Sequence, residues 1–295
     1  MNSLDTVQRF YFDNTDLRGE IITLHKTLLD AMAHHHPSPT CRTLLGEFFA
    51  AAGLIAGILK FEGILTLQVR GDGPISLIMA EATQERCLRG IVHTQDEIVE
   101  AELTGKSLQE LLGSGVLTIT LDPTEGQRYQ GIIALEGATL AEALSDYFAQ
   151  SEQLPTRLWL EADSTKAAGL LLQALPPTGE RKHNPELREE EFNGALQLAN
   201  TISRDELLNL SHEEILYRLF NSYSLRLMPE ITTQFRCSCS KARSGNALIS
   251  LGMQDAYDLL AEQKVIGIDC QFCGQHYSFE QKDLDAIFHV EGGAH

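Results

Sequence analysis

The chain has 295 residues, of which 43% are apolar, and this length suffices for one large globular domain and a small one. Its formal net charge of −18 weighs against nucleic-acid binding, because a phosphate backbone repels an acidic surface. The most apolar stretch, residues 44–59, is interrupted by Glu47, Gly53 and Gly57 and is shorter than the roughly 20 residues that span a bilayer. It predicts a buried helix, and we expect no membrane contact.

Residues 1–177 have the patterns of a mixed α/β body with antiparallel hairpins. Alternating apolar residues separated by turn residues indicate strands, and apolar residues at helical spacing indicate helices. The predicted elements are a helix at residues 41–60, hairpins at 64–79 and 116–135, a helix at 140–150 capped by Thr139, and strands near Trp159 and at 169–175. Hairpins mixed with a few helices are typical of the α+β class.

Two phosphate-binding motifs in the body are incomplete. Gly105-Lys106-Ser107 resembles the end of a phosphate-binding loop, but Glu100 stands where its first glycine should be. Gly71-Asp72-Gly73 lacks a third glycine at position 76. We therefore expect neither ATP nor dinucleotide binding, and no pattern predicts an enzyme. The run His34-His35-His36 has no neighbouring acidic or cysteine ligand, so we expect a solvated loop there.

Residues 178–232 are predicted to form a charged helical linker. Between residues 178 and 214 there are nine acidic and four basic residues. Ser211 and Glu214 form a capping box ahead of an amphipathic helix. Such a segment has too few apolar residues for a core of its own, so it should be stable only while docked on the body or on the tail. The alternative interpretation is a passive charged spacer.

Residues 233–295 contain four of the six cysteines, in two tight pairs. Two such pairs can surround a tetrahedral Zn²⁺ ion, and four thiolates leave no open position for a reacting water, so the site would be structural. The 30 residues at 240–269 must carry their own structure, and a helix ending near Lys264 and a strand at 265–269 are expected. A small α+β module of this kind has little core, so it needs a cross-link such as a bound metal ion to be stable. The predicted ligands of one zinc ion are Cys237, Cys239, Cys270 and Cys273.

Other interpretations of the cysteines are possible. Clustered thiols also make redox switches, and the same four could be ordinary cysteines or a disulfide framework. No charged-then-apolar leader with a cleavage site is recognisable, so we expect a cytoplasmic protein in which thiols stay reduced. Cys41 and Cys87 stand singly in apolar surroundings and are predicted to be core residues.

Several motifs along the chain together resemble one family. They are Asp16-Leu17-Arg18-Gly19, the run at residues 68–74, the run at 147–156 that ends Ser-Glu-Gln-Leu-Pro-Thr, and the two cysteine pairs. In these motifs the chain resembles the 33 kDa chaperonin family, the redox-regulated bacterial heat-shock holdases. The resemblance covers almost the whole sequence, and the cysteine pattern is its most specific part.

The resemblance implies a cytoplasmic chaperone whose body and linker hold unfolding client proteins, while the C-terminal zinc module senses oxidants. It places the zinc ligands at Cys237, Cys239, Cys270 and Cys273, and it implies disulfides Cys237–Cys239 and Cys270–Cys273 in the oxidised form. It also implies a homodimer when the protein is active.

The sequence therefore predicts an ATP-independent holdase that is silent when reduced and zinc-bound and active when oxidised. One rival is a zinc-ribbon adaptor without chaperone activity, which would keep a stable fold after mild oxidation. Another is an oxidoreductase using Cys270 and Cys273, although this pair lacks the βα context of such enzymes.

Overall fold

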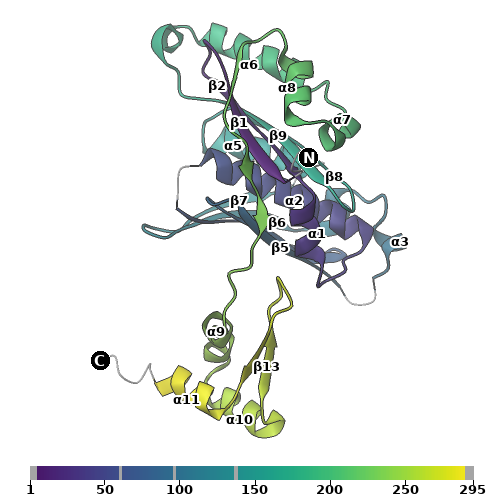
Figure 1. Ribbon diagram of the computed structural model, residues 1–295, viewed down its shortest axis with the longest axis vertical. Helices are drawn as coiled ribbons and strands as arrows, with labels where there is room; N and C mark the ends of the chain where they lie inside the picture. Colours follow the sequence, from purple (N-terminus) through teal and green to yellow (C-terminus); the bar gives the residue numbers. More distant parts are fainter. Residues whose placement is uncertain (1–4, 60–61, 96–97, 136–138, 290–295) are drawn as a thin grey trace. The chain divides into compact units, whose positions relative to one another are not determined.

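A computed structural model of the chain describes residues 5–59, 62–95, 98–135 and 139–289. The chain divides into two compact units, one of residues 1–32 with 36–236 and one of residues 33–35 with 237–295. The larger unit has two six-stranded sheets and the helices around them, and the smaller unit has a two-stranded sheet with helices (Figure 1). The predicted α+β class with antiparallel hairpins is confirmed.

The first sheet, sheet A, combines the beginning of the chain with segments far along it. Its strands are β10 (Leu225–Leu227), β1 (Thr6–Phe12), β2 (Leu17–Leu24), β9 (Ala167–Ala174) and β8 (Thr156–Ala162) in spatial order, with β11 (Ile231–Thr232) also paired to β1. All these pairs are antiparallel. The strands expected near Trp159 and at 169–175 are β8 and β9, whereas β1 and β2 were not predicted.

The second sheet, sheet B, contains both predicted hairpins. Its strands are β12 (Gln234–Phe235), β5 (Cys87–Thr94), β4 (Ile75–Thr83), β3 (Gly63–Arg70), β6 (Val116–Pro123) and β7 (Tyr129–Ala134) in spatial order. The pair β3/β4 and the pair β6/β7 are the expected hairpins. Only β12 runs parallel to its neighbour, and this strand comes from the segment just before the first cysteine pair.

One long apolar helix, α2 (Pro39–Ile58), packs against both sheets and joins them in one hydrophobic core. By length and composition α2 could cross a membrane, but 83% of its most apolar window is buried inside the protein, as expected of a core helix. The predicted helix at 41–60 is thus confirmed up to Ile58, and Lys60 lies outside the described residues. Shorter helices border this core: α1 (Lys26–Met32), α3 (Glu100–Leu103), α4 (Leu108–Leu112) and α5 (Leu140–Ser151), the last with the predicted Thr139 cap.

Helices of the linker cover the other face of sheet A (Figure 1). After a short 3-10 helix at Gly179–His183, the linker helices are α6 (Pro185–Ala199), α7 (Arg204–Asn209) and α8 (His212–Phe220). The capping box of Ser211 and Glu214 is present at the start of α8. Leu207, Leu216 and Phe220 are at most 2% exposed and pack against the sheet. The apolar face of the amphipathic linker therefore rests on the body.

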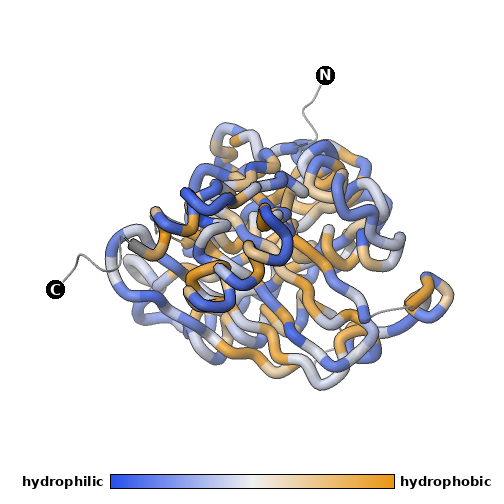
Figure 2. The backbone as a smooth tube through the Cα atoms, turned by 90° about the horizontal axis from the view of Figure 1, so that it is seen from below, coloured by the Kyte–Doolittle hydropathy of each residue, from blue (hydrophilic) through white to orange (hydrophobic). Residues whose placement is uncertain are grey.

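The central strand β9 shows how sheet A is covered on both sides. Every residue of β9 is buried. Leu171 belongs to the core shared with α2, whereas Leu170 and Leu172 belong to the core shared with the linker helices. Successive side chains of a strand point to opposite faces, so the run at 169–175, which is apolar except for Gln173, contributes to two separate cores. Figure 2 shows hydrophobic stretches, in orange, alternating with hydrophilic ones, in blue, along the chain.

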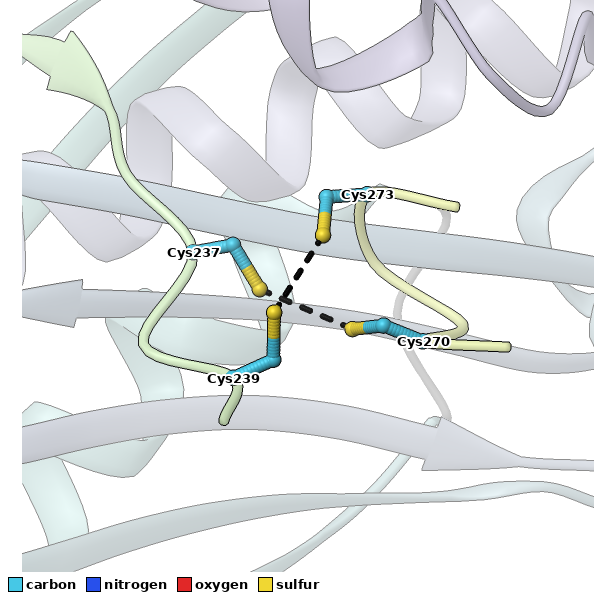
Figure 3. Close-up of side chains that lie close together, drawn as sticks. All are labelled: Cys237, Cys239, Cys270 and Cys273. Carbon is cyan, nitrogen blue, oxygen red and sulfur yellow. Dashed lines mark hydrogen bonds between the residues drawn. The ribbon is translucent and has the colours of Figure 1, made fainter. Parts of the chain in front are cut away.

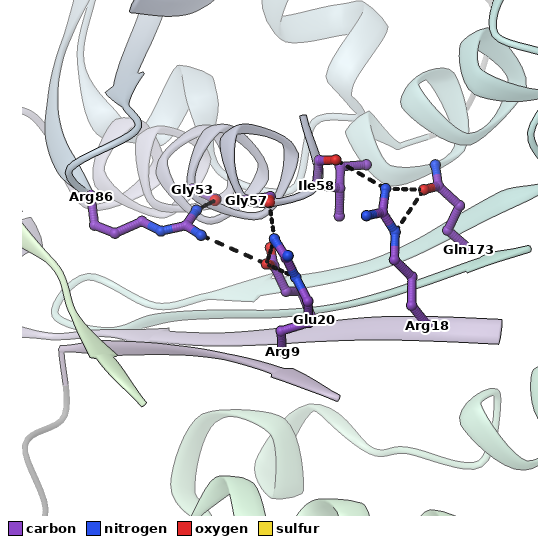
Figure 4. Close-up of polar contacts among 8 residues, drawn as sticks. All are labelled: Arg9, Arg18, Glu20, Gly53, Gly57, Ile58, Arg86 and Gln173. Atoms are coloured by element: carbon purple, nitrogen blue, oxygen red, sulfur yellow. Dashed lines mark hydrogen bonds and ion pairs between the residues drawn. The ribbon is translucent and has the colours of Figure 1, made fainter. Parts of the chain in front are cut away.

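Buried charges attach the last turns of α2 to sheet A (Figure 4). Glu20 on β2 is 1% exposed and lies 2.9 Å from the guanidinium of Arg9 and 3.7 Å from that of Arg86. Arginine side chains donate to carbonyls of α2, namely Arg86 to Gly53, Arg9 to Gly57 and Arg18 to Ile58. Carbonyls in the last turn of a helix lack partners within the helix and carry partial negative charge, so Arg9 at Gly57 and Arg18 at Ile58 stabilise the end of α2.

A buried histidine lies where the linker meets sheet A. His212 begins α8, is 4% exposed, and its Nε2 lies 3.0 Å from the Thr23 hydroxyl on β2. Burial lowers the pKa of this imidazole to about 4. The ring is therefore neutral at pH 7, although the Glu230 carboxylate lies 3.6 Å from its Nδ1.

This histidine should make the larger unit acid-sensitive. An unfolded histidine titrates near pH 6.5. Between pH 6.5 and about 4 the unfolded state binds more protons, so the stability present above pH 6.5 is lost as the pH falls. We expect a loss of about 2 kcal/mol in free energy of unfolding between pH 7.5 and pH 5 from this group. Urea unfolding of the wild type and His212→Gln at both pH values tests this, because the variant should lose that part of the pH dependence. Equal pH dependence of the two proteins would contradict it.

The smaller unit is built around a modest core. Its strands β13 (Ile266–Asp269) and β14 (His276–Phe279) form an antiparallel pair, and its helices are α9 (Lys241–Leu251), α10 (Met253–Gln263) and α11 (Gln281–His289). The fully buried apolar residues are Leu248, Ala256, Leu260, Ile266, Phe279 and Leu284. The expected helix ending near residue 264 and the strand after it are confirmed.

Candidate metal centre

Two short loops of the smaller unit bring the four clustered cysteines together (Figure 3). Cys237 and Cys239 lie just before α9, whose N-cap Ser240 accepts a hydrogen bond from the Arg243 amide. Cys270 follows β13, and Cys273 lies in the turn that leads toward β14. The chain can reverse there because Gly274 has a φ of +67°, and its amide donates to the Cys270 carbonyl at 2.8 Å.

The four sulfur atoms form one compact cluster. Cys237 Sγ lies 3.6 Å from Cys270 Sγ, and Cys239 Sγ lies 3.4 Å from Cys273 Sγ. All four ligand atoms lie within 4.8 Å of one another. Four sulfurs bound tetrahedrally at about 2.3 Å from a metal stand about 3.8 Å apart. The cluster has the size that such a site needs, so the four cysteines could hold one metal ion.

Polar groups beside Cys239 favour negative charge on its sulfur, whereas burial and the neighbouring thiols raise the pKa of Cys237 and of Cys273. The Tyr277 hydroxyl donates to Cys239 Sγ at 3.1 Å. Burial raises the pKa of the Cys239 thiol, but hydrogen bonds from Tyr277 and the other cysteines outweigh it and lower the pKa to about 7. The N-terminus of α9, which begins two residues after Cys239, adds the positive end of a helix dipole. Arg243 stands nearby, because its guanidinium donates to the Ser238 carbonyl at 3.0 Å.

The other residues singled out in the sequence lie in the surroundings that were predicted for them. Cys41 and Cys87 are 1% and 5% exposed and lie in the body, as predicted for core residues. His34, His35 and His36 lie in an exposed segment, and none of them joins a ligand cluster among the described residues. Tyr277 was missed because one aromatic residue in a short strand carries no pattern that points to a thiol.

Comparisons with known proteins agree with the motifs. The chain matches the family model described as Hsp33 protein over residues 5–280. It is 50% identical over 286 residues to the 33 kDa chaperonin of Ectopseudomonas mendocina (strain ymp), covering 96% of this chain and 95% of that protein. It is 48% identical over 290 residues to the 33 kDa chaperonin of Pseudomonas paraeruginosa (strain DSM 24068 / PA7), covering 98% of this chain and 96% of that protein.

A solved structure shares the fold. The crystal structure of the 33 kDa chaperonin from Thermotoga maritima is similar with a TM-score of 0.80 and 22% identity, covering 99% of this chain and all of that one. Sequence motifs, family model, relatives and fold point the same way, and the chain belongs to the Hsp33 family.

Proposed function

We propose that this protein is a cytoplasmic, ATP-independent holdase chaperone that binds unfolding client proteins when oxidants act on its cysteine cluster. Its relatives carry the name of a chaperonin, which supports a chaperone function. The compact cluster of four sulfurs supports control by metal and redox state. The acidic net charge of −18 supports solubility in a protein that handles aggregation-prone partners.

The proposed metal is one Zn²⁺ ion held by Cys237, Cys239, Cys270 and Cys273 in the reduced protein. When bound, zinc would keep the four sulfurs deprotonated and cross-link the two loops. The loops lie at both ends of the segment that contains α9, α10 and β13, so this cross-link closes around most of the smaller unit. Six fully buried apolar residues are a small core, and metal binding of about 10 kcal/mol exceeds what such a core supplies.

Oxidation would remove this support. A thiolate attacks the peroxide and becomes a sulfenic acid, and a neighbouring thiolate then attacks that sulfur and displaces hydroxide to form a disulfide. The two sulfurs together lose two electrons, and the peroxide is reduced to two molecules of water. With two disulfides the four sulfurs can no longer serve as thiolate ligands. The smaller unit should then lose its order.

The proposed pairs are Cys237 with Cys239 and Cys270 with Cys273. In the folded site the shortest separations instead join the two loops, at 3.6 Å and 3.4 Å. Local pairs are nevertheless favoured once oxidation of the first thiolate has loosened the two loops, because partners with only one or two residues between them stay close in a flexible chain. We expect mass-spectrometric mapping of peroxide-treated protein to find the two local disulfides. Disulfides between the loops would contradict this pairing.

The observation that carries the proposed mechanism is the docking of the linker helices on sheet A. Side chains from both surfaces are buried there, among them Phe10, Phe12 and Leu170 from the sheet and Ile215 and Phe220 from the linker. Linker release would expose both apolar surfaces to clients, and a homodimer of the oxidised form could cover part of them. In the reduced form the same surfaces are hidden.

The decisive experiment compares reduced and oxidised protein as suppressors of aggregation of a thermally unfolding client, without ATP. The oxidised form should suppress aggregation and the reduced form should not. Zinc content and the folding of the smaller unit, measured on the same samples, should fall together on oxidation. Equal activity of the two forms would refute the switch, and an intact smaller unit after oxidation would favour an adaptor role instead.

A further inference from the structure

The segment after the linker helices, residues 224–236, forms a strap along the edges of both sheets. Its strands β10 and β11 pair with β1, and its strand β12 pairs with β5. β1 and β5 would be edge strands of sheets A and B without it, since no other strand pairs with their outer sides among the described residues. The strap therefore completes both sheets, and it ends one residue before Cys237.

The strap is held mainly through its backbone. The Met228 amide donates to the Arg9 carbonyl at 2.8 Å, and the Asp13 amide donates to the Ser224 carbonyl at 2.9 Å. Further along, the Thr233 amide donates to the Asp5 carbonyl at 2.9 Å. Of the large apolar side chains of β10, β11 and the turn between them, Leu225 packs against the core beside sheet A, whereas Leu227, Met228 and Ile231 are 41%, 41% and 49% exposed.

This attachment differs from that of the linker helices. The helices are held by buried apolar side chains, so their sequence decides whether they fit. The strap is held largely by main-chain groups, which every polypeptide possesses, and also by side-chain contacts such as Ser224 with Asp13 and Arg226 over the Tyr11 ring. The β1 edge is consequently a site at which extended segments of many different sequences could bind.

The edge has one side-chain preference. β1 faces the strap in a register that sets Leu227 opposite Phe10 and Leu225 opposite Phe12. Phe10 and Phe12 point toward the linker side of sheet A, where Leu225 packs beside them. An added strand with apolar residues at alternate positions would extend this apolar face.

We propose that the β1 edge, once the strap has left it, binds an extended segment of the unfolded client as an added antiparallel strand. The client segment would replace the strap. Its backbone would form hydrogen bonds with the Arg9 carbonyl and the Asp13 amide, and its alternate apolar side chains would lie beside Phe10 and Phe12. Unpaired groups on an edge strand are a template for such pairing. The inference rests on the proposed holdase function and gives it a binding mode. The far edges, β7 and β8, are not covered by the strap, so its release does not change their pairing.

The test uses synthetic strap peptides with the sequence of residues 224–235 as competitors. Oxidised full-length protein is first bound to fluorescent, carboxymethylated α-lactalbumin, which is permanently unfolded. Three peptides are compared: unmodified, N-methylated at Met228, and N-methylated at Leu227. The Met228 amide faces β1, whereas the neighbouring Leu227 amide points away, because backbone groups alternate in direction along a strand.

We expect the unmodified and the Leu227-methylated peptides to displace the client equally well. The Met228-methylated peptide should be about fivefold to tenfold weaker, the effect of one lost hydrogen bond. Equal potency of the two methylated peptides, or no displacement by any peptide, would overturn the inference while leaving the holdase function intact. Failure of the oxidised protein to bind the client at all would refute the proposed function and this inference with it.

Amide exchange of Asp13 provides a second readout on the protein itself. Its amide is hydrogen-bonded to the strap in the structure, so it should exchange slowly in the reduced protein. It should exchange faster after oxidation and slow again when the client is added. An amide that stays exposed in the client complex would contradict strand addition at β1.

Discussion

Phe220→Ala should give a protein that holds clients without any oxidant. The Phe220 ring is 1% exposed, with its centroid 5.0 Å from that of Phe12 and 6.1 Å from that of Phe10. Truncating a buried phenylalanine costs about 3–5 kcal/mol. Most of this cost falls on the contact between α8 and sheet A, because the ring belongs to that core. The docked state of the linker should lose most of its stability, while all four clustered cysteines stay in place.

Two readouts follow this change in the reduced variant. Aggregation of a thermally unfolding client should be suppressed. The fluorescence of Trp159, the chain's single tryptophan, should shift to the red, because its indole nitrogen donates to Asn200 at the end of α6 at 3.1 Å. Tyr217→Ala is the matched control, since Tyr217 lies in the same helix and is 72% exposed. A reduced Phe220→Ala protein that remains inactive, with unchanged fluorescence, would show that linker docking does not keep the protein silent.

The second large effect is expected at the cysteine cluster. Cys239→Ser leaves three thiolates and replaces the sulfur that accepts from the Tyr277 hydroxyl with a neutral oxygen. Metal binding contributes about 10 kcal/mol to a structural zinc site, so weakened binding should unfold the smaller unit and activate the protein without oxidant. Zinc content per chain and the dispersion of amide signals from residues 241–289 measure the two steps.

Cys41→Ala serves as the control for the loss of a cysteine. Cys41 lies in α2 within the body, 1% exposed, and belongs to no ligand cluster among the residues that the structure describes. This variant should keep one zinc ion per chain and a folded smaller unit, although the body loses some stability. If Cys239→Ser retains both the metal and its native amide spectrum, the site does not hold the smaller unit together.

The candidate metal centre could be predicted from the sequence because each cysteine pair is complete within four residues. The structure brings the two pairs together into one cluster, while their role as zinc ligands stays a prediction. The hairpins β3/β4 and β6/β7 were predictable for the same reason, since each joins neighbouring segments. The Ser211 and Thr139 caps also follow from short-range spacing.

Contacts between distant segments could not be predicted. β2 pairs with β9, about 150 residues further along the chain, and the sequence of neither strand indicates which strand is its partner. The amphipathic pattern of α8 showed that it must bury one face, but not that this face meets Phe10 and Phe12. The strap escaped prediction because its strands are short and its apolar side chains remain largely exposed. Pairing through main-chain groups places few constraints on the side chains, so the amino-acid sequence does not reveal it.

Because β9 is buried on both faces, substitutions at neighbouring residues of this strand should have different effects, one on regulation and the other on folding. Leu170 faces the linker helices, and Leu171 faces the core around α2. Polar replacements at position 170 should give a folded chaperone that is active without oxidant. The same replacements at position 171 should destabilise the body and give little folded protein. A library across this single strand would thus divide into gain-of-function and loss-of-abundance alleles at alternating positions.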